Sequence, residues 1–391
     1  MPTYKPYHPE QAELLPSHVK DVLGENHLCF LVHEVVEKLD IRPFEAAYGD
    51  AGGESPYHPR MMLKVWLYAF ALKVKSTRKL EQRIKEDLGF RFLAGGCAPD
   101  FKTVSEFLRL QRAAIVEVFT QVLQLLRGAG LARVGEVAID STRIKGNASR
   151  DRVVQRAALQ RQVEQWMDEV EDDPDRQPGR EVSAEQRQRV REQLRQLEEM
   201  GEEKLSLTDP EARFLRTRQG YELGYTGEIA VSEDHFIVAQ RVTQNKTDNT
   251  SLLPMVEEVE RQCRERPRRV LADSGFYSNA NVEQLEQRGI DGYVPDSNLA
   301  SELRGQRRAE EIDRQPVVDA GLHRMRQKLR TAAGRRQYQR RKQLVEPMIG
   351  SLKEHGGMRQ FQRRGRSNVA VEWALAAVAL NLKRWYRVRQ G

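Results

Sequence analysis

Cysteine is scarce in this chain of 391 residues, and long apolar runs are absent. The three cysteines, Cys29, Cys97 and Cys263, are scattered and form no CxxC pair, which argues against a zinc site and favours a reducing, cytoplasmic compartment. The longest apolar run, 369–382, is interrupted by Glu372 and is too short to span a bilayer. No signal-peptide pattern opens the chain. The sequence therefore predicts a soluble cytoplasmic protein with no membrane partner.

What the chain has in abundance is charge, unevenly distributed. Charged residues make up 31% of the sequence and the net charge is +7. Residues 331–391 hold 14 Lys/Arg against 3 Asp/Glu, a local net of +11, whereas residues 151–210 hold 10 against 16, a local net of −6. The C-terminal segment is therefore the expected polyanion-binding face, with a merely solvated basic surface as the alternative.

Two apolar runs end in an aspartate. Val137-Ala-Ile-Asp140 and Arg269-Val-Leu-Ala-Asp273 both have the pattern of a buried strand that ends in a carboxylate. A third carboxylate, Glu346, lies in a basic stretch with helical character. A strand-end aspartate alone is more often a cap or turn residue. Two of them with a late helical glutamate favour a site for divalent metal, because Mg²⁺ prefers hard carboxylate oxygens.

The remaining pattern predicts an α/β chain. Residues 1–130 are expected to be helical, as a helix-turn-helix-like DNA-binding domain or as an ordinary packing domain. Residues 131–391 are expected to form the catalytic domain, beginning with a strand over 134–140. An insertion over about 151–210 is expected to be a helical hairpin, either a solvated spacer or a surface that packs on a second subunit. A β-hairpin is expected at 220–231 and 235–242.

The C-terminal half continues the alternation. We expect a helix over 251–265, a strand over 269–273, a helix over 280–288 and a strand over 292–295. The polar segment 297–335 has little periodicity and is expected to be a loop. A helix over 337–355 carries Glu346, and Pro347 predicts a kink there or a helix start near Val345. The last helix is expected over 370–387.

These motifs together resemble the DDE transposases of bacterial insertion sequences. The resemblance is carried by Asp140-Ser-Thr-Arg-Ile-Lys-Gly-Asn-Ala-Ser, by Asp273-Ser-Gly-Phe-Tyr-Ser, by Tyr338…Arg341…Glu346-Pro…Lys353, and by the N-terminal His58-Pro-Arg-Met-Met-Leu-Lys and Pro99-Asp-Phe-Lys-Thr-Val-Ser-Glu-Phe. It covers nearly the whole chain. The family's helix signature is Tyr, two residues, Arg, three residues, Glu, six residues, Lys. Here six residues separate Glu346 from Lys353, but four separate Arg341 from Glu346.

The resemblance implies a ribonuclease H-like mixed sheet with a helical N-terminal domain and an inserted helical hairpin. It implies that Asp140, Asp273 and Glu346 are catalytic and bind Mg²⁺ or Mn²⁺. Glu354 is the rival for the third carboxylate, although Glu346 and Lys353 share a helix face and Glu354 does not. Residues expected to contact DNA are Lys353, Arg341, Tyr338, Arg143, Lys145, Arg363 and Arg364. For Arg143 and Lys145 the alternative is that they face water, and for Lys353 that it is a solvated lysine at the helix end.

The implied function is cleavage of insertion-sequence ends and their joining to target DNA by two-metal phosphoryl transfer. The partner is double-stranded DNA, on which a homodimer or larger assembly is expected to form. Two alternatives remain open: a catalytically inactive DNA-binding protein derived from a transposase, and a stand-alone ribonuclease H-like nuclease. Strand joining separates the last of these from a transposase.

Overall fold

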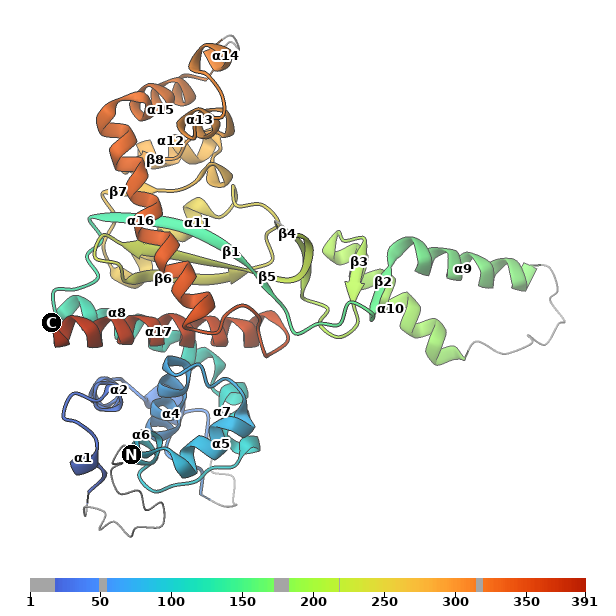
Figure 1. The fold of residues 1–391 in the computed structure, drawn as a ribbon. Coiled ribbons are helices and arrows are strands. Elements are labelled where there is room, and N and C mark those ends of the chain that lie inside the picture. The colour runs from blue at the N-terminus through green and yellow to red at the C-terminus, as the bar shows by residue number, and fades with distance from the viewer. Residues whose placement is uncertain (1–17, 49–54, 172–182, 218, 314–318) are drawn as a thin grey trace, which may run out of the picture.

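The N-terminal part of the chain is a bundle of short helices. The computed structural model describes residues 18–48, 55–171, 183–217, 219–313 and 319–391 (Figure 1). The bundle comprises α1 (Val19–Val22), α2 (Leu28–Glu37), α3 (Arg42–Glu45), α4 (Pro59–Ala71), α5 (Thr77–Glu86), α6 (Leu88–Ala94), α7 (Phe101–Leu110) and α8 (Arg112–Gly128).

Local sequence sets the boundaries of these helices. Pro59 occupies the first turn of α4, as expected from its fixed φ and missing N–H. The side chains of Ser76, Asp87 and Asp100 accept backbone N–H bonds at the starts of α5, α6 and α7. Helix α4 is buried along nearly its whole length and contacts α2, α6 and α17, so the bundle is built around it.

A mixed sheet forms the centre of the molecule, with β1 in its middle. Strand β1 (Glu136–Lys145) runs antiparallel to β5 (Gly220–Ser232), and β5 runs antiparallel to β6 (Ile237–Thr243) and, at its other end, to β4 (Arg213–Thr217). On its other side β1 is parallel to β7 (Arg269–Leu271), which is parallel to β8 (Asp291–Tyr293). The order β6-β5-β1-β7-β8, three antiparallel strands followed by two parallel ones, is that of a ribonuclease H-like fold, as expected.

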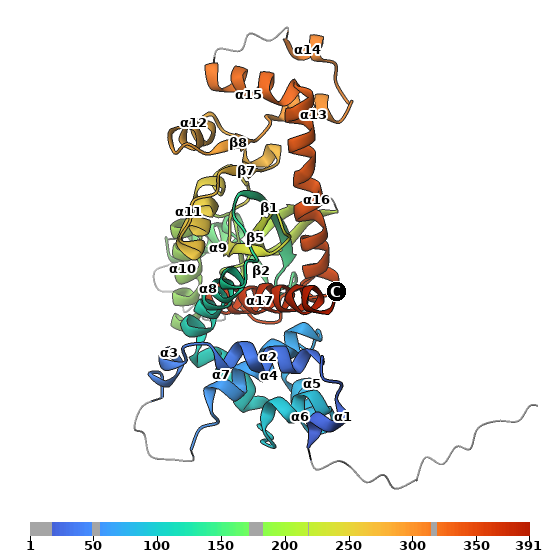
Figure 2. The ribbon, with the colours of Figure 1, turned by 90° about the vertical axis from the view of Figure 1, so that its left-hand side faces the viewer.

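Helices on the sheet link it to the helical bundle. The helices α11 (Leu252–Cys263), α12 (Asn279–Gln287), α16 (Ala332–Glu354) and α17 (Arg366–Gln390) follow the strands, and α17 lies between the sheet and the bundle (Figures 1 and 2). Helix α17 contacts α8, α4 and β6, so sheet and bundle share one hydrophobic core. No helix in the described ranges is long and apolar enough to cross a membrane.

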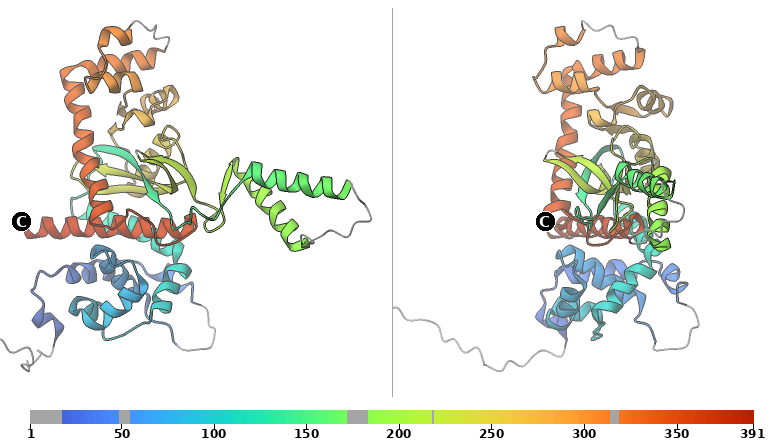
Figure 3. Two further views of the ribbon diagram at one scale, coloured as in Figure 1. Left: turned by 45° about the vertical axis from the view of Figure 1, so that its right-hand side comes forward. Right: turned by 90° about the vertical axis from the view of Figure 1, so that its right-hand side faces the viewer.

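The expected helical hairpin projects from the sheet. Strands β2 (Val153–Gln155) and β3 (Lys204–Ser206) pair at its base, and α9 (Arg156–Glu171) and α10 (Ala184–Met200) extend outward (Figures 1 and 3). A small separate core of Leu159, Val190, Leu197 and Leu205 holds it together. The sequence Asp172-Asp-Pro-Asp-Arg-Gln-Pro-Gly179 predicts a break in the middle of the hairpin, and these residues lie outside the described ranges.

One expectation is wrong: most of 297–335 is helical, not a loop. The segment contains α13 (Ser297–Leu303), α14 (Ala309–Asp313) and α15 (Ala320–Arg330), with Asp296 and Asp319 as N-caps of α13 and α15. Arg326 on α15 is buried against Asp296, with an Nη2–Oδ2 distance of 2.9 Å. Apolar periodicity misses this helix because a charged residue occupies a core-facing position and is neutralised by a partner thirty residues earlier.

Of the two expectations for Pro347, a kink or a helix start near Val345, the helix start is wrong. Helix α16 begins at Ala332, where Thr331 accepts the N–H of Gly334, and continues through Pro347 to Glu354. A proline inside a helix removes one backbone hydrogen bond and costs about 3 kcal/mol. The buried side chains of Leu344, Val345, Met348 and Leu352 on the sheet-facing side offset that cost.

Candidate active site at the carboxyl ends of β1 and β7

A polar cavity of about 1060 Å³ opens at one edge of the central sheet. Segments far apart in the sequence contribute to it: β1, the β4–β5 turn, the loop after β6, the loop after β7, and the C-terminal end of α16. Its lining residues are Asp140, Ser141, Thr142, Arg143, Lys145, Arg216, Thr217, Gln219, Glu222, Asp248, Asp273, Lys353 and Arg359.

The expected end of the first strand at Asp140 is wrong: β1 continues to Lys145, and Asp140 lies within it, two residues beyond Ala138, the last residue that pairs with β7. Its Oδ1 accepts the N–H of Ser141 at 2.8 Å, and its Oδ2 accepts a hydrogen bond from Nη1 of Arg341 at 3.0 Å. Burial raises the pKa of Asp140 to about 6; Arg341 opposes this rise, and the nearby carboxylates of Asp273 and Asp248 add to it. The charged form of Asp140 is therefore held in place mainly by one guanidinium.

Asp273 reaches the same cavity from the neighbouring strand. Because β1 and β7 run parallel and Ala138 pairs with Leu271, Asp140 and Asp273 each lie two residues beyond the last paired position of their segment. Asp273 follows β7 and caps the 3₁₀ turn η1 (Ser274–Phe276), where its Oδ1 accepts the N–H of Gly275 at 2.8 Å. The two aspartates, 133 positions apart in the sequence, thus line one cavity and interact electrostatically.

The third predicted carboxylate, Glu346, does not line the cavity. It is exposed on α16, but it interacts electrostatically with Arg341. Arg341 and Glu346 are five residues apart, which corresponds to about 140° of rotation around the helix. Glu346 and Lys353 are seven residues apart, or about 20°, so they share one side of α16, and Lys353 does line the cavity. Glu354, its rival, forms an ion pair with Arg359.

No preformed metal cluster is present in the described part of the chain, where no three His, Cys, Asp or Glu side chains are grouped to hold an ion. Arg341 contacts Asp140 and interacts electrostatically with Asp273 and Glu346. Burial lowers the pKa of Arg341, and Asp140, Tyr338, Asp273 and Glu346 raise it, so that its pKa lies above the ordinary value. The metal role of these three carboxylates stays a prediction.

Arg341 occupies the centre of this arrangement. Only 7% of the residue is exposed, and its Nε is buried without a hydrogen-bond partner in the described structure. Tyr338, one turn earlier on α16, lies with its ring centroid 6.0 Å from the guanidinium carbon. Both residues were predicted to contact DNA, and both lie beside the carboxylates.

Asp248 is a site residue that the sequence did not reveal. It follows β6, and its Oδ1 accepts hydrogen bonds from Ser141 Oγ at 2.8 Å and from Arg143 Nη1 at 2.9 Å. No apolar run precedes it directly, so it lacks the strand-end pattern of the other two aspartates. The available signal was the polar stretch Asn245-Lys-Thr-Asp-Asn-Thr-Ser251 between a predicted strand and a predicted helix.

The other predicted DNA contacts fall into two groups. Arg143, Lys145 and Lys353 line the carboxylate cavity. Arg363 and Arg364 follow α16, where Arg363 Nη2 donates to the backbone oxygen of Ser105 at 2.8 Å and Arg364 Nε donates to that of Asn147 at 2.7 Å.

Gly275 provides a test of how closely the carboxylates must be held. A Cβ at this position would lie 3.1 Å from Asp273 Oδ1 and 3.2 Å from Asp248 Oδ2, so both carboxylates would have to shift. Because displacements of about 1 Å in an active site cost roughly a hundredfold in rate, we expect Gly275→Ala to slow strand cleavage by roughly tenfold. Cleavage kinetics on a labelled duplex measure this, with an unchanged melting temperature as the control. A wild-type rate would show that the site tolerates such a shift.

The sheet order and the two aspartates in one cavity beside β1 and β7 define the class of the protein as ribonuclease H-like. Two family models match the chain: "Transposase domain (DUF772)" over residues 17–110 and "Transposase DDE domain" over residues 303–386. The matches, at either end of the chain, support its assignment as a DDE transposase, in agreement with the motif resemblance.

Two further comparisons add little to this assignment. No curated protein matches. One solved structure, titled "Crystal structure of a pre-cleavage Mos1 transpososome", is similar at 10% identity over 88% of this chain and 83% of that chain. Its TM-score is 0.20, so the family models carry the assignment.

Proposed function

We propose that this transposase cleaves the ends of its own mobile element and joins them to target DNA, with the β1–β7 cavity as its active site. The observation that supports this most directly is the placement of Asp140 and Asp273 on adjacent parallel strands within one polar cavity. Arg143, Lys145 and Lys353 line the same cavity and supply positive charge for a phosphate backbone.

The donor set fits a divalent metal ion. Asp140, Asp273 and Glu346 would hold Mg²⁺ or Mn²⁺ through carboxylate oxygens, the ligands that these hard cations prefer. The raised pKa of Asp140 reflects burial and neighbouring negative charge, an unfavourable arrangement that a bound cation relieves. When bound, two such ions activate the attacking oxygen and stabilise the leaving oxygen of a phosphodiester. Arg341 would have to share or release Asp140 for the carboxylate to bind metal.

In this proposal the chain divides its tasks. Residues 1–130 form a helical DNA-binding domain, and residues 131–391 form the catalytic domain with its insertion over about 151–210. The strongly basic C-terminal segment, with a local net charge of +11 from 14 Lys/Arg and 3 Asp/Glu over 331–391, supports duplex DNA as the partner. Two ends must be brought together for joining, so a homodimer or larger assembly on DNA is proposed as well.

The decisive experiment uses the purified protein with Mg²⁺ or Mn²⁺ and a labelled duplex carrying the DNA that flanks its gene. We expect strand cleavage at the element end, followed by joined products when a target plasmid is added, and loss of both with EDTA. Binding without cleavage would favour a catalytically inactive DNA-binding protein. Cleavage without joining would favour a stand-alone nuclease. Activity unchanged by EDTA would contradict the metal-dependent mechanism.

A further inference from the structure

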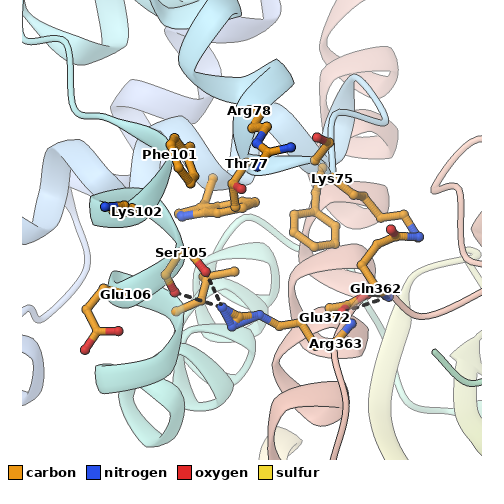
Figure 4. Close-up of a pocket in the computed structure, with 14 residues that line it drawn as sticks. Lys75, Thr77, Arg78, Phe101, Lys102, Ser105, Glu106, Gln362, Arg363 and Glu372 are labelled. Atoms are coloured by element: carbon orange, nitrogen blue, oxygen red, sulfur yellow. Dashed lines mark hydrogen bonds between the residues drawn. The ribbon is translucent and has the colours of Figure 1, made fainter. Parts of the chain in front are cut away.

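A second cavity, separate from the carboxylates, lies where the helical bundle meets the segment after α16 (Figure 4). Its volume is about 650 Å³. The bundle contributes the starts of α5 and α7 together with part of α4, and the C-terminal part contributes the segment before α17 and one residue of α17 itself. The lining residues are Trp66, Phe70, Lys75, Ser76, Thr77, Arg78, Phe101, Lys102, Ser105, Glu106, Leu108, Gln362, Arg363 and Glu372.

The side chains around this cavity carry an excess of positive charge. Four cations line it: Lys75, Arg78, Lys102 and Arg363. Of the two acids, Glu106 forms an ion pair with Arg109 outside the cavity. Glu372, which is 2% exposed, accepts the backbone N–H of Gln362 at 3.0 Å and so holds the turn before α17. The charge available to a ligand is therefore positive.

Two helices begin at this cavity, and the N-terminus of α5 adds to its positive potential. Helices α5 and α7, each ten residues long, both begin at the cavity, which is lined by Thr77 and Arg78 from one first turn and by Phe101 and Lys102 from the other. The N-terminus of a helix carries a partial positive charge and favours anions. At the start of α7, the N–H groups of Phe101 and Thr103 already donate to the carboxylates of Glu81 and Asp100. Helix α5 is capped by the neutral Ser76, so its dipole and the cationic side chains favour an anionic ligand.

The floor of the cavity is apolar. Trp66, Phe70 and Leu108 line it beside Phe101, and the guanidinium carbon of Arg78 lies 5.3 Å from the centroid of the Phe101 ring. Cationic groups above an aromatic floor suit a ligand that combines a phosphate with a flat or sugar-like apolar surface. A nucleotide unit of a DNA strand has this combination.

Arg363 connects the two sides of the cavity. Its Nη2 donates to the backbone oxygen of Ser105 at 2.8 Å and to Ser105 Oγ at 3.3 Å, bridging the C-terminal segment to α7 (Figure 4). Burial lowers the pKa of Arg363, with Glu372 opposing and Arg112 adding to this effect. A phosphate bound nearby would compensate the buried charge.

The cavity is also mechanically linked to the carboxylate site. The N–H of Phe361 donates to the backbone oxygen of Lys145 at 2.9 Å, and Lys145 pairs with Gln360 as a parallel bridge. Lys145 ends the strand that carries Asp140, five residues or about 17 Å earlier. The segment from Gln360 to Arg363 is therefore fixed relative to the carboxylates, through a strand whose exposed end carries basic residues.

We propose that this cavity binds a phosphate of the DNA backbone at a fixed distance from the cleavage site, clamping one strand between the helical bundle and the catalytic sheet. The proposal rests on the proposed transposase function and adds a specific contact to it. It assigns Arg78 and Lys102, which are exposed at the cavity rim, to phosphate binding.

The test compares Arg78→Gln/Lys102→Gln with the wild type. Both positions are exposed, so the double variant is expected to fold with an unchanged melting temperature. Anisotropy of a labelled duplex carrying the element end, measured over a range of salt, should show roughly tenfold weaker binding. The slope of log K against log salt should become shallower by about 0.9, the contribution of one neutralised phosphate. Arg91→Gln, a similar loss of charge at an exposed position on α6 outside the cavity, is the matched control and should bind as the wild type does.

Interference by ethylated phosphates locates the contact. A phosphate whose ethylation weakens wild-type binding should cease to matter for the double variant, while other sensitive phosphates keep their effect. If the wild type binds DNA with a steep salt dependence and the double variant matches it, this inference fails and the proposed function stands. If the wild type binds no duplex at all, the proposed function fails first. A third outcome would overturn the DNA contact. If free dAMP stabilises the wild type but not the double variant, while both bind DNA with the same salt slope, the cavity binds a free nucleotide.

Discussion

Asp140→Asn is expected to abolish strand cleavage while leaving DNA binding intact or slightly tighter. The substitution removes a charged oxygen donor where β1 reaches the cavity, and neutral amides are poor ligands for Mg²⁺. Changing even the partners of metal ligands costs about 10- to 100-fold, so losing a ligand itself should cost more than about 100-fold in cleavage rate. Removing a negative charge cannot weaken attraction to phosphate, so the anisotropy of a labelled duplex should show an unchanged or lower dissociation constant.

A matched variant separates a catalytic effect from a general one. Asp151→Asn makes the same change at an exposed position that does not line the cavity, and it should cleave at the wild-type rate. Asp140 pairs with Arg341, so a melting curve of Asp140→Asn checks that the buried guanidinium still finds an acceptor in the amide oxygen. Asp273→Asn should behave as Asp140→Asn does. Full cleavage by both aspartate variants would remove the β1–β7 cavity from consideration as the active site.

Asp140 and Asp273 could be identified in the sequence because each directly follows a run of apolar residues. A strand buried on both faces has a continuous apolar pattern, so Val137–Ile139 and Val270–Ala272 stand out. The first polar residue after the second run follows β7, whereas the one after the first run, Asp140, lies within β1, which continues to Lys145. Parallel pairing of β1 with β7 then places both at one edge of the sheet. The expectation of a ribonuclease H-like sheet rested on the same pattern and on the family motifs, and the observed strand order confirms it.

What could not be predicted depends on long-range contacts between polar groups. The Arg341–Asp140 pair joins residues 201 positions apart, and no local pattern indicates that this arginine is buried on a carboxylate. Asp248 is identified as a site residue only from the structure, in which the loop after β6 places its carboxylate against Ser141 and Arg143. Helix α15 was missed for the same reason, because a buried Arg326 replaces the apolar residue that periodicity requires.

The third carboxylate has two candidates on α16, Glu346 and Glu354. Glu346 and Glu354 both lie exposed on α16, one at each end of its last two turns. Glu354 is held by Arg359, itself a lining residue of the cavity. Glu346 interacts with Arg341, which already contacts Asp140, and shares its helix stripe with Lys353. These neighbours favour Glu346 as the carboxylate that completes the metal site.

Glu346→Gln is therefore expected to lose strand cleavage by more than about 100-fold, as the aspartate variants do. Glu354→Gln should keep most of its activity, because an exposed ion pair such as Glu354–Arg359 contributes only about 0–1 kcal/mol.

Metal binding gives a second readout that does not depend on turnover. An ion that binds only the folded state stabilises it by about 2.7 kcal/mol at 100 times its dissociation constant, so Mn²⁺ should raise the melting temperature of the wild type and of Glu354→Gln. Glu346→Gln should show a much smaller rise. The reverse pattern, with Glu354→Gln inactive and insensitive to Mn²⁺ while Glu346→Gln behaves as wild type, would transfer the ligand role to Glu354 and require Arg359 to release it. If both variants cleave and respond to Mn²⁺ normally, α16 supplies no ligand, and Asp248, which already lies beside Asp273 across Gly275, becomes the third carboxylate to test.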